Sequence, residues 1–213
     1  DAGELSLDDF MTLEQSDYVD GVGETNWQSP GTQLSLGWLL EQMITRSDNT
    51  ATDMLIRRVG MDNVNAHLKI LVPEGFERIT TLADVRRHAY SEFHPNAFDL
   101  DGLEFIDIRK AQREPARLAA ISRFIGVPVS EFRARDLSTA FDNYYATGLN
   151  AGQLDAYGEL LARLVRGEAL SAESTTYLLN VMQQTRSGSQ RLRAEWPASV
   201  EFAHKTGTQR GRF

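Results

Sequence analysis

The sequence predicts an α+β fold that is mostly helical, and three observations lead to this prediction. Apolar residues recur at helical spacing through most of the chain. A period of two, which is typical of a strand, appears only near the end, at 200–205. The 213 residues contain no internal repeat and are enough for one domain with a real core, or for most of a larger one.

The elements follow in order from local patterns. Residues 1–33 are rich in turn formers and read as an extended connection. Apolar spacing predicts a helix over 34–44, a second helix that ends at Gly60, and a shorter one over 62–71.

Further helices are predicted at 116–125, at 153–165 and after Ser171, which suits an N-cap. The strand at 200–205 completes the pattern. A single strand leaves its backbone donors and acceptors unpaired. Its partners, and the rest of the domain, are therefore expected outside these 213 residues.

Composition excludes several classes of function. A formal net charge of -8 argues against nucleic acid as a partner, and the basic pair Arg86-Arg87 is expected on a solvated helix face. There is no cysteine, and the four histidines have no metal-ligand spacing, so we expect no thiolate or histidine metal site. No apolar run approaches the length of a membrane span.

The tripeptide Ser47-Asp48-Asn49 lies where one predicted helix ends and the next begins. Residues two apart at such a junction can both face a cleft while the residue between them points inward. A hydroxyl there can relay a proton to a leaving nitrogen, and a carboxamide can accept from an amide N–H. The alternative is a simple N-cap cluster, because all three residue types are favoured there.

The tripeptide Lys205-Thr206-Gly207 closes the predicted strand. An ammonium about 4 Å from a carboxylate is worth up to ~4 kcal/mol at an intermediate dielectric, which is enough to orient an anionic substrate. Gly207 lets a substrate approach the main chain closely. The alternative is an ordinary exposed lysine on an edge strand.

Together, in this order, the two tripeptides resemble those of the class A β-lactamases, whose motifs are Ser-x-x-Lys, Ser-Asp-Asn and Lys-Thr-Gly. The similarity covers residues 1–70 and 136–208. It implies the β-lactamase/transpeptidase-like fold, of which this chain would be mostly the helical part plus the strand that carries Lys-Thr-Gly.

The resemblance also implies roles for individual residues. Ser47 would be the proton shuttle, and Asn49 would bind the side-chain amide of the substrate. The remaining positions form the substrate-binding stretch: Lys205 and Thr206 would hold the substrate carboxylate, Gly207 would admit it, and the Thr208 backbone N–H would be one oxyanion-hole donor.

Two features depart from the family pattern. No serine from Ser6 to Ser199 has Lys three residues on, so the nucleophile is expected upstream of Asp1, and this stretch alone should be inactive. The deacylating glutamate of the family is followed four residues later by Asn, on a loop. Glu92 and Asn96 have this spacing, but their neighbours differ from the family's, and an accidental match is the alternative.

The chain therefore divides into four parts of one partial domain. Residues 1–96 hold helices and the Ser-Asp-Asn motif, and 97–135 form an insertion with a helical pattern of its own. Residues 136–199 are helical again, and 200–213 carry Lys-Thr-Gly.

The resemblance implies a serine β-lactamase that opens the β-lactam ring through an acyl-enzyme and needs neither a metal nor an organic cofactor. The alternatives are a penicillin-binding D-Ala-D-Ala peptidase or transpeptidase, and a non-catalytic homologue that binds muropeptide or a partner protein. The expected protein is a monomer, exported to the periplasm or the cell exterior, with a small-molecule β-lactam as its substrate.

Overall fold

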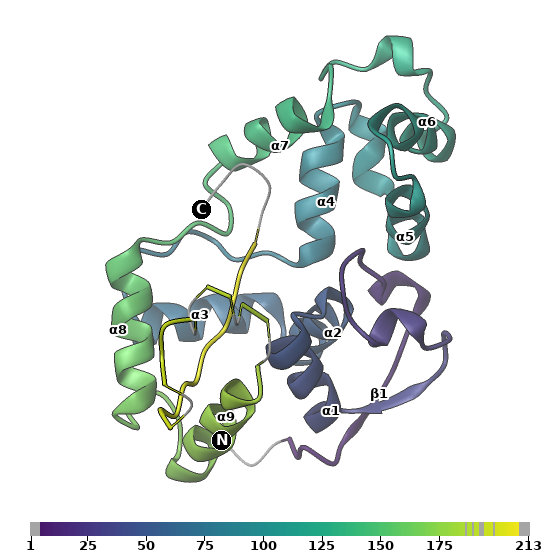
Figure 1. Ribbon diagram of the computed structural model, residues 1–213. Helices are drawn as coiled ribbons and strands as arrows, with labels where there is room; N and C mark the ends of the chain where they lie inside the picture. Colours follow the sequence, from purple (N-terminus) through teal and green to yellow (C-terminus); the bar gives the residue numbers. More distant parts are fainter. Residues whose placement is uncertain (1–4, 186, 189, 192–193, 198, 209–213) are drawn as a thin grey trace.

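The computed structural model describes residues 5–208 except 186, 189, 192–193 and 198. Figure 1 shows two groups of helices, one above the other. We call residues 82–146 the helical lobe, and residues 5–81 with 147–208 the base.

The base begins with a small sheet. Strands β1 (Phe10–Thr12) and β2 (Gln33–Ser35) pair antiparallel, with Met11 opposite Leu34 and both side chains buried. The sequence was interpreted as an extended connection here, and that prediction is wrong at these two strands. Three residues are too few to establish a period of two.

The helices of the base were largely predicted. They are α1 (Leu36–Glu41), α2 (Asn49–Val59), α3 (Met61–Leu71), α8 (Leu154–Val165) and α9 (Ala172–Gln183), with the π-helical turn η3 (Gln42–Arg46) between α1 and α2. Gly60 ends α2 as expected. The Ser171 hydroxyl caps α9 by accepting from the Ser174 N–H at 3.2 Å.

The helical lobe contains α4 (Leu82–Ser91), α5 (Gly102–Lys110), α6 (Glu114–Ile125) and α7 (Leu137–Ala146). Helices α5 and α6 and the short 3₁₀ turn η5 (Val129–Glu131) lie within 97–135, and α6 is the helix predicted at 116–125. Helices α4 and α5 were not predicted, and α7 lies in the stretch 136–199 that was expected to be helical without being located there. The loop expected around Glu92 is instead the end of α4, where Glu92 is the C-cap.

Each group of helices has its own core. In the base, Leu13, Leu39 and Met54 are fully buried together. In the lobe, Phe93 and Phe105 are fully buried, and the remaining residues with no exposed surface in that core are Val19, Ala89, Ala97, Ile108, Ile121 and Ala140. Val19 belongs to the base by its position in the sequence, but its side chain is packed into the core of the lobe.

The strand predicted at 200–205 is not formed. The stretch Glu201–Thr208 is irregular, and no ladder joins it to any other described segment. The His204 N–H donates to the Met182 carbonyl at 3.4 Å, and His204 is buried. A strand needs a paired neighbour to satisfy its backbone, and the described chain places none beside this segment. Residues 209–213 lie outside the described residues.

Candidate active site

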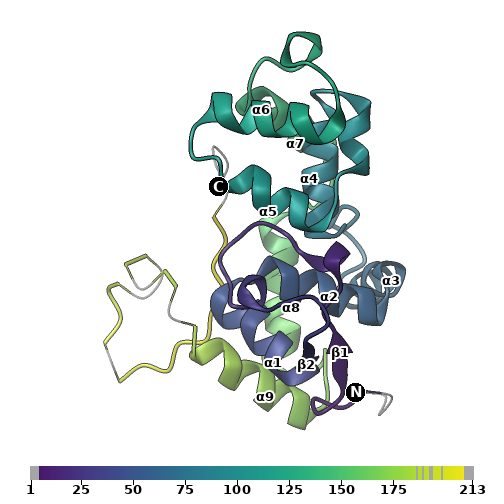
Figure 2. The ribbon, with the colours of Figure 1, turned by 90° about the vertical axis from the view of Figure 1, so that its right-hand side faces the viewer.

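Ser47 and Lys205 are in direct contact, although 158 positions separate them in the sequence. The Lys205 Nζ donates to the Ser47 Oγ at 2.8 Å. As Figure 2 shows, the chain after α9 loops outward and then comes back toward the helices of the base. The two tripeptides therefore meet at one place.

Ser47 stands at the end of η3 in a left-handed backbone conformation, with φ 59° and ψ 41°. Its N–H donates to the Gln42 carbonyl, which closes the wide turn of η3. Because the hydroxyl oxygen accepts from Lys205, the hydroxyl proton is left to point elsewhere, which is the arrangement that a proton relay requires.

Asp48 is fully buried and points inward, as predicted. Its Oδ1 caps α2 by accepting from the Ala51 N–H at 3.0 Å, and its Oδ2 accepts from the Thr25 N–H at 3.0 Å. The capping interpretation is therefore confirmed for Asp48. Ser47 and Asn49, on either side of it in the sequence, are half-buried.

Asn49 is oriented by the backbone before it. Its Nδ2 donates to the Asp20 carbonyl at 2.7 Å. That donation fixes which end of the carboxamide faces the loop, so Oδ1, the accepting atom, is turned away from the Asp20 carbonyl.

The ammonium of Lys205 has a second partner, the Thr206 carbonyl, at 2.8 Å. Lys205 as a whole residue is exposed, but its ammonium is partly desolvated, and this desolvation lowers its pKa from the usual 10.5. The ammonium is therefore closer to giving up a proton than an ordinary surface lysine.

The residues after Lys205 have side-chain partners from the segment that follows α9. The Thr206 and Ser187 hydroxyls lie 2.6 Å apart, and the Arg191 Nη1 donates to the Thr208 Oγ1 at 3.2 Å. Gly207 has open space where a Cβ would lie. Arg191 adds a second cation beside the motif, and the sequence interpretation did not single it out.

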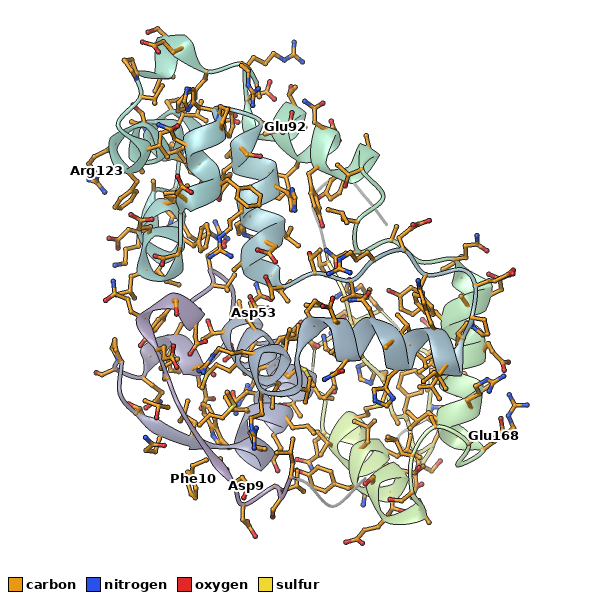
Figure 3. The ribbon with its side chains drawn as sticks, turned by 180° about the vertical axis from the view of Figure 1, so that it is seen from behind. Asp9, Phe10, Asp53, Glu92, Arg123 and Glu168 are labelled. Carbon is orange, nitrogen blue, oxygen red and sulfur yellow. The ribbon has the colours of Figure 1, made fainter. Side chains whose placement is uncertain are left out.

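Glu92 is not brought to this place. Its Oε2 accepts from the Asn143 Nδ2 at 2.8 Å. Figure 3 places Asp53 beneath the first turn of α4 and Glu92 beyond the far end of that helix. The ten residues of α4 span about 15 Å.

Asn96, the other member of the predicted pair, points toward the Ile125 carbonyl, at 3.5 Å. The described structure therefore does not assemble Glu92 and Asn96 at Ser47.

Sequence interpretation missed the loop that supports the tripeptide. Thr50 accepts from the Val19 N–H at 2.9 Å, and Asn49 and Asp48 bind the same loop. A Cβ on Gly21 would lie 2.7 Å from the Asn49 Nδ2, and one on Gly23 would overlap the Asp48 carboxylate. The two glycines were a signal, because they allow one backbone to approach another closely.

Among the described residues, no cluster of His, Asp or Glu is arranged to hold a metal ion. None of the helices in that part of the chain is both long and apolar enough to cross a membrane.

Comparison with known proteins identifies the family. The profile described as "Beta-lactamase enzyme family" matches residues 1–212, so the chain belongs to that family. Beta-lactamase VEB-1 from Pseudomonas aeruginosa is 31% identical over 75 residues, which are 35% of this chain and 23% of that protein.

Solved structures share the fold. A variant of PBP-A, in an acyl-enzyme complex with penicillin G, superposes with a TM-score of 0.62 at 21% identity and covers 97% of this chain and 55% of its own. The β-lactamase from Sphaerobacter thermophilus gives a TM-score of 0.60 at 22% identity, with coverages of 97% and 57%. This chain therefore spans little more than half the length of these structural relatives.

Proposed function

We propose that this member of the β-lactamase enzyme family serves as a serine β-lactamase-like hydrolase, which opens the β-lactam ring through an acyl-enzyme. The observation that carries the proposal is the 2.8 Å hydrogen bond from the Lys205 Nζ to the Ser47 Oγ. It joins a cation to a hydroxyl at a half-buried turn.

In this proposal the serine nucleophile lies outside these 213 residues, which contain no Ser-x-x-Lys. It attacks the β-lactam carbonyl, and backbone amides, including that of Thr208, receive the oxyanion. The Ser47 hydroxyl donates its proton to the departing nitrogen and recovers one from Lys205. Water then cleaves the ester.

Substrate binding is divided between the two tripeptides. The Lys205 ammonium and Thr206 hold the carboxylate of the substrate, and Gly207 leaves room for it beside the main chain. The Asn49 Oδ1 accepts from the side-chain amide of the substrate. Export to the periplasm or the cell exterior belongs to this proposal, since β-lactams act there.

One observation favours a second candidate, a penicillin-binding D-Ala-D-Ala peptidase. Glu92 is held by Asn143 at the far end of α4 rather than beside Ser47. An enzyme without a base at the ester would acylate and release slowly. Glu92 as the deacylating base remains a proposal, which Glu92→Ala tests: the base must lie elsewhere if turnover survives.

The test uses the protein at its full natural length. It is mixed with a chromogenic cephalosporin, and the intact mass is recorded in parallel. Sustained hydrolysis supports the β-lactamase. A persistent acyl adduct with little turnover supports the peptidase, and the absence of both hydrolysis and adduct overturns the proposal.

A further inference from the structure

Asp20 connects the helical lobe to the candidate site through its carboxylate and its backbone carbonyl. The carbonyl of this residue accepts from the Asn49 Nδ2 at 2.7 Å. Its carboxylate accepts from the Arg86 Nε at 2.5 Å, and the Arg109 Nε lies 3.9 Å away. One residue thus contacts both the site and two helices of the lobe.

The pair of Asp20 and Arg86 is buried. The side chains are 9% and 17% exposed, respectively, and the Arg86 guanidinium lies 5.9 Å from the centre of the Phe141 ring. The Asp20 carboxylate keeps the pKa of Arg86 above its usual value, against the effect of burial. A buried charge left without its partner is strongly unfavourable, so Arg86 holds the Asp20 turn in one position.

The contacts close into a ring. Asn49 begins α2, and Asp53, one turn later, accepts from the Leu82 and Ala83 N–H groups at 2.8 Å each. Those N–H groups start α4, and Arg86 lies one turn further along α4. From Arg86 the ring returns through Asp20 to Asn49. Val19, which precedes Asp20 in the sequence, is fully buried in the core of the lobe and anchors the turn at Asp20.

We propose that Arg86 is a positioning residue that fixes the Asn49 carboxamide through Asp20. Its role in substrate selection rests on the proposed function, because it assumes that Asn49 binds the side-chain amide of a β-lactam. The geometric part, that Arg86 orders the Asn49 side chain, does not depend on any activity.

The geometric part is tested first, by NMR of the Asn49 side-chain amide in the full-length protein. Arg86→Gln should shift these resonances and speed the exchange of their hydrogens. The matched control is Arg87→Gln. Arg87 is the next residue of α4 and donates to the Leu100 carbonyl at 3.0 Å and to Asp84 at 2.9 Å. These partners differ from Asp20, the partner of Arg86. Equal changes in both variants would overturn the proposal.

Kinetics test the selective part. Benzylpenicillin carries a side-chain amide, whereas 6-aminopenicillanic acid has a free amine in its place. Arg86→Gln should lower kcat/KM for benzylpenicillin about tenfold or more and leave that for 6-aminopenicillanic acid within about twofold. Arg86→Lys, which keeps the charge, should recover part of the loss. An equal loss for both substrates would contradict a role through Asn49.

Two measures keep the outcomes distinct. If the wild-type protein reacts with neither compound, the proposed function fails, and the NMR comparison alone decides whether Arg86 orders Asn49. If Arg86→Gln does not fold, the double variant Asp20→Asn, Arg86→Met replaces it, because this variant leaves no unpaired buried charge. Unchanged Asn49 resonances in that variant would overturn the proposal.

Discussion

Ser47 adopts a conformation that few residues other than glycine accept. Its φ of 59° places it in the left-handed region. Such a conformation costs on the order of 1 kcal/mol or more and persists where the surroundings enforce it. Here the turn of η3 and the buried Asp48 on the other side fix the backbone, and the hydroxyl meets Lys205. The geometry of this one residue is what joins the two tripeptides.

The lowered pKa of Lys205 predicts that the acylation rate falls at alkaline pH. As pH rises through that pKa, the side chain loses its charge, and with it the proton that it can pass to Ser47 and the attraction for a carboxylate. We expect the acylation rate to fall with a midpoint below the usual 10.5 of lysine.

The measurement is the pH profile of acylation by a penicillin, with Lys205→Arg as the comparison. Arginine stays charged above pH 12, so any activity left in that variant should lack this fall. An identical fall in the variant would assign the titration to another group.

Gly21 predicts a second effect at the scale of one side chain. A methyl group there would lie 2.7 Å from the Asn49 Nδ2, which is closer than real contacts allow. Gly21→Ala should therefore displace the carboxamide and reduce kcat/KM for benzylpenicillin more than for 6-aminopenicillanic acid.

The matched control for this variant is Gly158→Ala in α8, where a Cβ meets nothing within 4 Å. Alanine in a helix is favoured over glycine by about 0.5–1 kcal/mol, so the control should be slightly stabilised and fully active. Equal kinetics in the two variants would show that Asn49 tolerates the added methyl group.

Ser47, Asn49 and Lys205 were predictable because short motifs of polar residues carry them. Arg86 was not. The pair Arg86-Arg87 was expected on a solvated face, and that expectation is wrong for Arg86, whose side chain is 17% exposed. Local sequence does not reveal a buried ion pair, because the partner, Asp20, lies 66 positions away.

At the scale of elements, α4 depends on a contact from another helix. Thr81 caps it locally by accepting from the Asp84 N–H at 3.0 Å, and the buried Asp53 of α2 accepts two further N–H groups. That tertiary contribution explains why α4 was missed. Helices α6, α8 and α9 were found because their apolar spacing and end signals are local.

Asp53 predicts how stability depends on pH. Burial raises its pKa from 3.8 to about 6, against two backbone donations that lower it. The folded state therefore binds this proton more tightly than the unfolded chain does. The charged Asp53 carboxylate therefore lowers the free energy of unfolding. This loss of stability is small below about pH 4, grows between pH 4 and 6, and reaches about 3 kcal/mol above pH 6.

The free energy of unfolding should be measured for the wild type and for Asp53→Asn at pH 4 and pH 7. The value for the wild type minus that for the variant should rise by about 3 kcal/mol as the pH is lowered. A difference that does not change with pH would mean that the Asp53 carboxyl titrates equally in both states.

For the whole molecule, the sequence predicted a mainly helical chain and a structured region within 97–135, but not the arrangement of lobe and base. Burial of Val19 in the core of the lobe and the capping of α4 by Asp53 join the two parts. Both contacts depend on the folded chain rather than on a local pattern. The strand at 200–205 was mispredicted because alternation alone does not supply a paired neighbour.

The fold of the base brings Ser47 and Lys205 into contact with each other, and Asp20, which pairs with Arg86 of the lobe, orients Asn49. If the first two act as one proton relay, removing either should cost nearly as much as removing both, because residues that act as a unit are not additive. The Ser47 and Lys205 side chains are therefore expected to be coupled energetically.

The most direct test is a double-mutant cycle of Ser47→Ala and Lys205→Ala, followed through the rate at which the full-length protein is acylated by a fluorescent penicillin. We expect each single variant to lose about 10²-fold or more, and the double variant to lose little beyond the worse single one. Losses that multiply, or an acylation rate that neither substitution changes, would contradict the relay.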